Sequence, residues 1–253
     1  TPGGEYKETL LTGAAAAAKG GTTTCGDMPN TSPRTTTIAA LEQKLALSDG
    51  ARCNLLFNFG AEPDNLDQVR KAVQHPAVRA LKIYMGPSTG QGGLDPHSAR
   101  AQFSAAGALG LPVIVHAEDL DLIEAQDGAH PHDAAHHHAL RGLEAELRAV
   151  DNALDWAREF GVRLCLAHVT SSQVLDRVEA SGLGEQVFVE VCLHHLLLST
   201  DDIKPPVENR FKVNPPIRPE TERLALFACL SEGIDVLGSD HAPHSLEEKS
   251  HPY

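Results

Sequence analysis

The chain has 253 residues, of which 42% are hydrophobic and 22% are charged, with 21 basic and 34 acidic side chains. This length and composition are typical of one large globular α/β domain with a well-buried core. The formal net charge of −13 and the lack of Lys and Arg clusters argue against a nucleic-acid partner. No run approaches the roughly 18 apolar residues that span a bilayer, so no membrane partner is expected.

The five cysteines, Cys25, Cys53, Cys165, Cys192 and Cys229, are widely spaced and form no Cys-x-x-Cys pair. This spacing supports neither a zinc ribbon nor a redox motif. We expect them to be small buried hydrophobic residues in a reducing cytoplasm. The chain opens on Thr-Pro-Gly-Gly-Glu without a visible signal peptide, which agrees with a cytoplasmic location.

Short apolar runs alternate along the chain with longer segments of helical periodicity. The apolar runs predict strands at 22–26, 53–59, 80–84, 112–116, 163–168, 187–191 and 234–239. The longer segments predict helices at 7–19, 36–47, 65–73, 98–109, 140–160, 172–180 and 219–231. Glycines follow three of these helices, at Gly20-Gly21, Gly110 and Gly161, where a left-handed residue commonly ends a helix. Repeated βα units with apolar strands predict a parallel sheet covered on both faces.

The number of strands bears on the choice of fold, because a closed β/α barrel needs eight. The chain starts on a loop that leads into a helix, so we predict an α/β fold, a (β/α)8 TIM barrel with about seven of its eight βα units present. The first strand is then expected upstream of Thr1. A doubly wound open sheet is the alternative, but no Gly-rich dinucleotide fingerprint follows any strand. Two open strand edges would make the chain alone less soluble or less active than a longer protein.

Chemistry-bearing side chains follow several predicted strands. The last apolar run ends in Ser-Asp-His-Ala-Pro-His, which places Asp240 at a strand end, and His116 and His168 end two other runs. Parallel barrels present catalytic groups at the C-terminal ends of their strands, and these residue types suit both a metal ion and proton transfer. A single strand-end histidine is more often structural, but several at equivalent positions indicate a metal site.

Lys82 lies inside a predicted strand, between Leu81 and Ile83. A buried lysine is costly unless it is paired or modified. Two interpretations stay open at this point. The side chain either extends from a sheet edge to water, or it is carboxylated by carbon dioxide and becomes an anionic bridge between two metals.

Other polar residues near strand ends are candidates for binding a substrate. Asn30 and Asn214 each offer a donor and an acceptor, which suit an amide or ureide edge, although both also lie in turn-like sequences. Glu190 and the pair His194-His195 either orient metal ligands or pack locally. The segment 130–138 holds five histidines in nine residues, and we predict a solvated loop outside the active site.

Eight short motifs are distributed along nearly the whole chain. They are Pro-Gly-Gly-Glu-Tyr-Lys-Glu-Thr at 2–9, Asp-Met-Pro-Asn-Thr at 27–31, Leu-Lys-Ile-Tyr-Met-Gly at 81–86, Val-His-Ala-Glu at 115–118, Ala-His-Val-Thr-Ser at 167–171, His-His-Leu-Leu-Leu at 194–198, Lys-Val-Asn-Pro-Pro at 212–216 and Ser-Asp-His-Ala-Pro-His at 239–244. Together these motifs resemble the dihydroorotases of the amidohydrolase superfamily.

The resemblance implies a binuclear zinc site. By position, Lys82 matches the lysine that is carboxylated and bridges two Zn²⁺ ions, and His116 and His168 match the ligands of one metal. Asp240 matches the ligand of the other metal and the catalytic proton shuttle.

The resemblance also implies a substrate and partners. Asn30, Asn214 and His244 match substrate-binding residues, and the family reaction is the reversible cyclisation of N-carbamoyl-L-aspartate to L-dihydroorotate in pyrimidine biosynthesis. A homo-oligomer is expected, with aspartate carbamoyltransferase as a candidate partner.

The chain departs from the family pattern in three places. Some dihydroorotases have an aspartate where this chain has Lys82. The His-x-His-x-Arg motif of the first strand is expected immediately before Thr1, together with a small flanking β domain, and Leu193 replaces the usual proline. Allantoinases and dihydropyrimidinase-like hydantoinases remain alternatives, although His195, where those relatives tend to have tyrosine, favours dihydroorotase. A non-catalytic scaffold subunit is a third alternative, but such subunits usually lose metal ligands that are present here.

Overall fold

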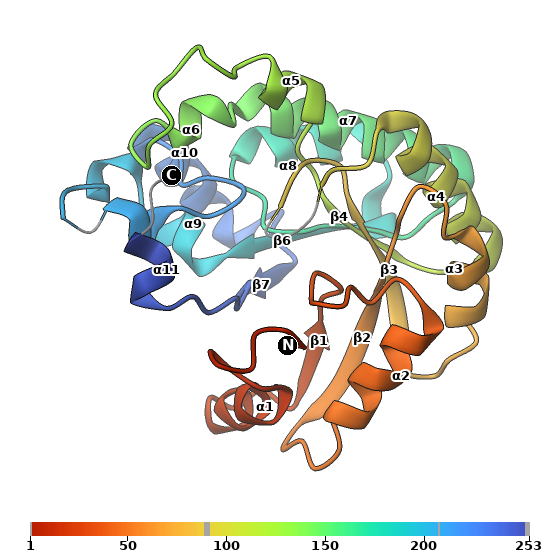
Figure 1. Ribbon diagram of the computed structural model, residues 1–253. Coiled ribbons are helices and arrows are strands. Elements are labelled where there is room, and N and C mark those ends of the chain that lie inside the picture. The colour runs from red at the N-terminus through yellow and green to blue at the C-terminus, as the bar shows by residue number, and fades with distance from the viewer. Residues whose placement is uncertain (1, 89–91, 207, 251–253) are drawn as a thin grey trace.

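A curled sheet of seven parallel strands forms the centre of the protein. The computed structural model describes residues 2–88, 92–206 and 208–250. The strands follow one another in chain order across the sheet, and helices cover its outer side (Figure 1). The strands are β1 (Thr24–Asp27), β2 (Asn54–Gly60), β3 (Val78–Tyr84), β4 (Val113–His116), β5 (Leu164–Leu166), β6 (Val187–Cys192) and β7 (Val236–Gly238). All seven predicted strands are confirmed, with ends that differ by at most two residues.

The predicted helices are also present, with two differences. The principal helices are α1 (Leu10–Lys19), α2 (Ile38–Leu47), α3 (Leu66–Ala72), α4 (Pro96–Leu109), α7 (Leu143–Phe160), α8 (Ser172–Ser181) and α10 (Glu220–Ala228). The helix predicted from 140 is divided, because α6 (His137–Leu140) ends before α7 begins. The segment predicted as one helix at 219–231 is likewise divided, into α10 and the 3₁₀ helix η4 (Cys229–Ser231). The short elements that were not predicted are α5 (Leu120–Glu124), α9 (Leu193–Leu197), α11 (Leu246–Ser250), η1 (Gly184–Gln186), η2 (Thr200–Asp202) and η3 (Glu208–Phe211).

The helix ends follow from local sequence. At α4, the Asp95 side chain accepts a hydrogen bond from the Ser98 backbone N–H at 3.0 Å and so caps the helix. Gly110 and Gly161 end α4 and α7 with φ of 64° and 66°, as predicted. After α1, the left-handed residue is Gly21.

The core lies between the sheet and the surrounding helices. Along β3 and β4, Leu81, Ile83, Val113 and Val115 are fully buried on one face of the sheet, and Lys82, which points to the other face, is buried as well. On the helical side, Phe103 of α4 meets Trp156 of α7 edge to face, with ring centroids 5.4 Å apart. These contacts fix the outer helices against the strands whose ends carry the candidate site.

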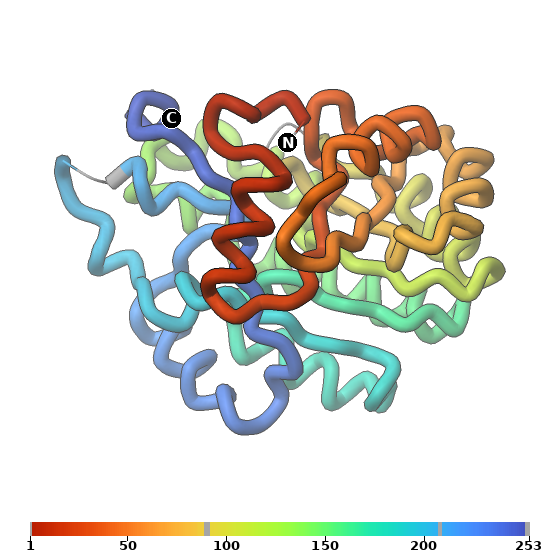
Figure 2. The backbone as a smooth tube through the Cα atoms, turned by 90° about the horizontal axis from the view of Figure 1, so that it is seen from below, coloured from red at the N-terminus to blue at the C-terminus, as the bar shows by residue number. Residues whose placement is uncertain are grey.

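The sheet is an open, curled half-barrel, because β1 and β7 do not pair with each other. The N-terminal segment and α1 instead lie beside the C-terminal segment (Figures 1 and 2). Glu8 accepts a hydrogen bond from His241 at 2.9 Å, and Lys7 pairs with Glu248 at 3.2 Å. Leu237 of β7 is 55% exposed at this opening. The arrangement agrees with the predicted partial (β/α)8 barrel and not with a doubly wound sheet.

The structure tests the predictions of buried cysteines and of a chain without a membrane-spanning segment. All five cysteines are free, but only Cys192 is buried, so the expectation of five buried cysteines is wrong for the other four. Cys25 and Cys53 lie at the start of neighbouring strands with their sulfurs 3.6 Å apart. No helix in the described ranges combines the length and apolar character needed to cross a membrane.

Truncation of Phe103 tests the packing between α4 and α7. We expect Phe103→Ala to lower the free energy of unfolding by about 3–5 kcal/mol, because the fully buried ring leaves a cavity. Phe188→Ala removes the same atoms from a side chain that is 43% exposed, and we expect a loss of about 1 kcal/mol or less. Urea denaturation measures both, and equal losses would contradict the described core.

Candidate metal centre

The four predicted metal ligands lie at the C-terminal ends of four strands. Lys82 is within β3 and His116 is the last residue of β4, while His168 and Asp240 lie two residues beyond β5 and β7. In the sheet, Tyr84 pairs with His116 and Lys82 pairs with Ile114, which places the lysine and the imidazole near the same rim. Lys82, His116 and His168 are buried, whereas Asp240 is exposed.

The two histidines face each other. His116 Nδ1 lies 3.1 Å from His168 Nε2, and the rings meet edge to face with centroids 4.8 Å apart. Two imidazole nitrogens bound to one tetrahedral zinc are separated by roughly 3.3 Å, given Zn–N distances of about 2.0–2.1 Å. The observed pair therefore fits one metal ion with little rearrangement.

Hydrogen bonds assign the tautomer of His116. Its Nε2 lies 2.7 Å from Glu118 Oε2. Burial opposes ionisation of Glu118, but the Arg141 guanidinium and the His116 hydrogen bond outweigh it and hold the pKa of Glu118 well below its ordinary value. The carboxylate can only accept, so Nε2 carries the hydrogen and Nδ1 has a free lone pair toward His168.

For His168 to bind the same ion through Nε2, its hydrogen must lie on Nδ1. Within the described residues, that buried nitrogen has no hydrogen-bond partner. Burial holds the pKa of His168 well below its ordinary value, with the neighbouring His116 as the next cause. Both imidazoles are therefore neutral near pH 7, which is the form that binds metal.

A buried ion pair holds Glu118 in place. Arg141 Nε donates to both carboxylate oxygens of Glu118, at 3.0 and 3.1 Å, and Nη2 donates to the Pro87 carbonyl at 2.6 Å. Glu118 ends the Val-His-Ala-Glu motif at 115–118, for which the sequence predicted no role at this residue. Nothing in the sequence indicated Arg141 as its partner. The pair fixes a histidine that faces the metal position, which is the usual role of such a carboxylate.

A second buried ion pair supports the first. Arg218 donates to the Arg141 carbonyl at 2.7 Å and pairs with Glu146 at 3.1 Å. Thr170 donates its backbone N–H to Glu146 at 2.9 Å, two residues after His168. The network thus joins the segments that carry both metal-facing histidines.

Lys82 lies in a dry environment, with 2% of its surface exposed. Burial lowers its pKa to about 8, although negative groups led by Asp240 favour its charged form. Its Nζ also lies 5.0 Å from the centre of the Tyr84 ring. A lysine with this pKa is substantially neutral at mildly alkaline pH, which is the form that reacts with carbon dioxide. The interpretation of Lys82 as a lysine that extends to water is therefore wrong.

The backbone is unusual at His168 and Asp240. They have φ of 44° and 43° and are the non-glycine residues with positive φ in the described chain. This conformation is uncommon outside glycine, and such outliers gather at functional sites. It turns the chain sharply at the ends of β5 and β7, where both side chains are presented.

The predicted substrate-binding residues are less closely connected. Asn214 Oδ1 lies 2.8 Å from His137 Nε2, while Asn30 is half-buried after β1 and His244 lies 3.6 Å from Glu248. Within the described chain, neither Asn30 nor His244 has a hydrogen bond or ion pair to the four metal-ligand candidates. The structure therefore does not join Asn30 or His244 to the candidate metal ligands through any such contact.

The histidine-rich segment 130–138 is only partly solvated. His137 is 4% exposed and also reaches the Val213 carbonyl at 3.0 Å. The prediction of a solvated loop away from the site is thus wrong for His137. Burial lowers its pKa to about 4, so it is neutral at pH 7 and holds the loop that carries Asn214.

One group of three donors lies close together elsewhere. Cys192, His194 and His195 each offer an atom within 4.8 Å of the others, and no other trio of His, Cys, Asp or Glu in the described residues does so. Asp240 is therefore not within that distance of both His116 and His168.

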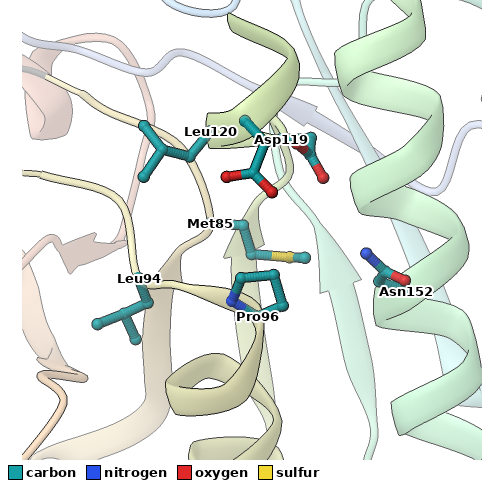
Figure 3. A pocket seen from close by; sticks show the side chains of 7 residues that line it. Met85, Leu94, Pro96, Asp119, Leu120 and Asn152 are labelled. Atoms are coloured by element: carbon teal, nitrogen blue, oxygen red, sulfur yellow. The ribbon is translucent and has the colours of Figure 1, made fainter. Parts of the chain in front are cut away.

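The cleft between α5 and α7 is distinct from these groups. Met85, Leu94 and Asn152 contribute to its lining, and Asp119 points into it (Figure 3). Its volume of about 10 Å³ holds no more than one water molecule. It is too small for an organic substrate.

An incomplete parallel β/α barrel with facing imidazoles at its strand ends is a typical scaffold for a metal-dependent enzyme. Residues 1–247 match the model of the amidohydrolase family, and the chain belongs to that family.

Several curated relatives are dihydroorotases. The chain is 32% identical to the one from Brevibacillus brevis and 36% identical to the one from Anoxybacillus flavithermus, over 98% of this chain in each case. It spans 59% and 58% of the lengths of these relatives.

The solved structures include other cyclic amidohydrolases. The L-hydantoinase from Arthrobacter aurescens superposes with a TM-score of 0.85 at 30% identity, covering 96% of this chain and 55% of that one. The dihydroorotase from Saccharomyces cerevisiae, in complex with 5-fluoroorotic acid, gives 0.76 at 23% identity, covering 96% and 67%, and supports the fold alone.

The role of Glu118 can be tested through metal affinity. We expect Glu118→Gln to weaken Zn²⁺ binding about 10- to 100-fold, because His116 loses the carboxylate that orients it. Competition with a chromogenic chelator measures the affinity, and circular dichroism checks the fold. Asp119→Asn is the matched control, since Asp119 pairs with Arg148 in the same segment. Equal affinities for the two variants would contradict the assignment.

The buried neutral histidines predict how stability depends on pH. The pKa of His137 is about 4 and that of His195 about 3, both lowered mainly by burial from 6.5. The unfolded chain takes up protons below pH 6.5 that the folded chain does not, so stability is present above 6.5 and lost as pH falls toward 4. Each histidine contributes a slope of about 1 kcal/mol per pH unit in this range.

Denaturation of the protein in excess chelator between pH 7 and 4.5 measures this slope. His137→Gln should make it shallower by about one proton, whereas the exposed His97→Gln should leave it unchanged. A parallel shift of the whole curve by His137→Gln, with no change in slope, would refute the prediction.

Proposed function

We propose that this chain forms most of the catalytic barrel of a dihydroorotase. Such an enzyme interconverts N-carbamoyl-L-aspartate and L-dihydroorotate, by closing or hydrolysing a cyclic amide, in de novo pyrimidine biosynthesis. The proposal rests on the pair His116 and His168, which face each other at 3.1 Å in a buried position at the ends of β4 and β5. Relatives at 32–36% identity that are named dihydroorotase support the choice of substrate.

The donor set of this chain fits one Zn²⁺ ion, and a second ion would also need the histidines of a His-x-His-x-Arg strand. His116 and His168 would hold one ion, Asp240 would hold the other, and a carboxylated Lys82 would contribute an oxygen to each. Bound zinc would supply a nucleophile at neutral pH, by lowering the pKa of water to about 7, and would polarise the substrate carbonyl. Because Lys82 is buried, a carbamate on its Nζ would be shielded from the bulk solvent that favours its loss.

Asp240 is the residue that would transfer the proton. Its carboxylate is exposed at the rim, and its backbone turns sharply at φ 43° just after β7. In the hydrolytic direction it would accept a proton from the attacking water at one carboxylate oxygen and deliver it to the ring nitrogen as the C–N bond breaks. In cyclisation the same carboxylate would take the proton from the attacking nitrogen and deliver it to the leaving carboxyl oxygen, which departs as water.

Substrate orientation falls to the polar groups around the opening. Asn30, Asn214 and His244 would contact the substrate, mainly at its carboxylate. His137 already occupies Asn214 Oδ1, which leaves the amide N–H donors of Asn214 for a carboxylate oxygen.

The relation to the rest of the protein is part of the proposal. We take residues 1–253 as one barrel domain, in which a further strand carrying a His-x-His-x-Arg motif would fit between β1 and β7. The active protein would be a cytoplasmic homo-oligomer that also associates with aspartate carbamoyltransferase. Gel filtration with and without that enzyme tests the association.

A substitution at Asp240 tests the proposed proton transfer. We expect Asp240→Asn to lower kcat for dihydroorotate hydrolysis by about 10²- to 10⁴-fold, because the amide cannot accept the proton. Asp235→Asn changes a carboxylate at the other end of the same strand, where it accepts from the Val189 N–H, and should retain activity. The assay uses a protein as long as its relatives. An Asp240→Asn variant that keeps full activity would contradict the assignment.

The choice of substrate is tested by comparison. We expect kcat/KM to be highest for dihydroorotate among dihydroorotate, hydantoin and allantoin. A higher value for hydantoin would favour the second candidate function, which the similarity to L-hydantoinase at 30% identity supports. A protein that holds no metal in zinc-replete buffer would instead favour a scaffold.

A further inference from the structure

The junction of β6 and α9 brings together three donor side chains that the proposed reaction does not use. Cys192 is the last residue of β6, and His194 and His195 lie in the first turn of α9. One donor atom from each lies within 4.8 Å of the others. We propose that Cys192, His194 and His195 form a second, separate metal site, which takes a thiophilic divalent cation such as Zn²⁺ or Cd²⁺.

The spacing is close to that of a metal site. Donors bound to one tetrahedral zinc are separated by roughly 3.3 Å between two nitrogens and roughly 3.6 Å between nitrogen and sulfur. Because the three atoms lie within 4.8 Å of one another, they need to approach by at most about 1.2–1.5 Å. The half-buried His194 and the short Cys192 side chain provide that movement by rotation, without displacement of the strand.

The hydrogen bonds of His195 leave a lone pair for a metal. Its Nε2 lies 3.1 Å from the Pro215 carbonyl, which can only accept, so Nε2 carries the hydrogen. The neutral ring then has a bare Nδ1, and this buried atom has no hydrogen-bond partner among the described residues. An unpaired buried nitrogen is costly, and a bound cation would satisfy it.

The other two donors complete a soft ligand set. His194 Nε2 is also buried and without a hydrogen-bond partner in the described chain, and Cys192 is fully buried. A thiolate with two imidazoles selects zinc, cadmium and similar ions over magnesium or calcium. Burial, and after it the nearby carboxylates Asp240 and Glu190, raise the pKa of the Cys192 thiol, so the metal-free site holds a thiol and a cation must displace its proton to bind.

Occupancy of this site would also act on the substrate loop. His195 joins α9 to the Pro215 carbonyl, and Asn214 precedes that proline. A cation on Nδ1 fixes the ring in the tautomer that donates to Pro215 and so holds the loop. This regulatory consequence rests on the proposed function, and it predicts a change in KM, whereas the site itself does not depend on it.

The test uses Cd²⁺ alone, added to the chain after a chelator has removed other bound metal. Bound cadmium gives a sulfur-to-metal absorption in the ultraviolet only when a thiolate is a ligand, and none of the residues proposed for the main centre carries sulfur. We expect one equivalent of Cd²⁺ to produce this absorption, with release of a proton from Cys192.

Variants assign the absorption to its ligands. Cys192→Ser should abolish it, and His194→Gln and His195→Gln should each weaken Cd²⁺ binding about tenfold or more. Cys165→Ser is the matched control, because this half-buried cysteine on β5 lies near Lys82 and should keep the absorption. If Cys192→Ser does not fold, the half-buried His194→Gln still tests the site.

The outcomes separate the two proposals. No absorption at stoichiometric Cd²⁺, or absorption that survives in Cys192→Ser or vanishes in Cys165→Ser, would overturn the second site. Absorption at Cys192 in a protein that does not turn over dihydroorotate would support the site and contradict the proposed function.

Discussion

The buried contact between Glu118 and Arg141 connects the candidate metal centre to the rest of the barrel. Glu118 receives the Nε2 hydrogen of His116, so it decides which nitrogen of that ring faces His168. Arg141 comes from the segment between α6 and α7 and also holds the Pro87 carbonyl after β3. The orientation of one imidazole thus depends on three separate parts of the chain, and the facing pair of histidines would lose its geometry if this contact were absent.

Two such ion pairs inside one protein are costly, because each charge loses its hydration. Glu118–Arg141 and Glu146–Arg218 reduce that cost by sharing partners, since Arg218 also donates to the Arg141 carbonyl. Replacement of such pairs by apolar residues is often neutral or stabilising in other proteins. Their presence beside the strand ends is therefore better explained by the orientation of His116 and His168 than by stability.

The sequence predicted the strands and their order well, because continuous apolar runs bounded by turn residues are local signals. It also placed Lys82, His116, His168 and Asp240 at strand ends for the same reason. It did not predict Arg141 as the partner of Glu118 or His137 as the partner of Asn214, which are separated by 23 and 77 residues. Such contacts depend on how loops fold over the rim, and a polar residue in a loop carries no signal for its distant partner.

The two candidate metal positions differ mainly in the chemical type of their ligands. The main centre offers imidazoles and oxygen ligands, whereas the second offers a thiol with two imidazoles. The general order of metal affinities does not decide which ion binds at which site. The softness of the ligands and their geometry decide it. An ion such as cadmium would therefore gather first at Cys192, while zinc could bind both. Under both proposals, an ion at the softer site would act on the loop that is proposed to bind substrate, because His195 reaches the Pro215 carbonyl beside Asn214.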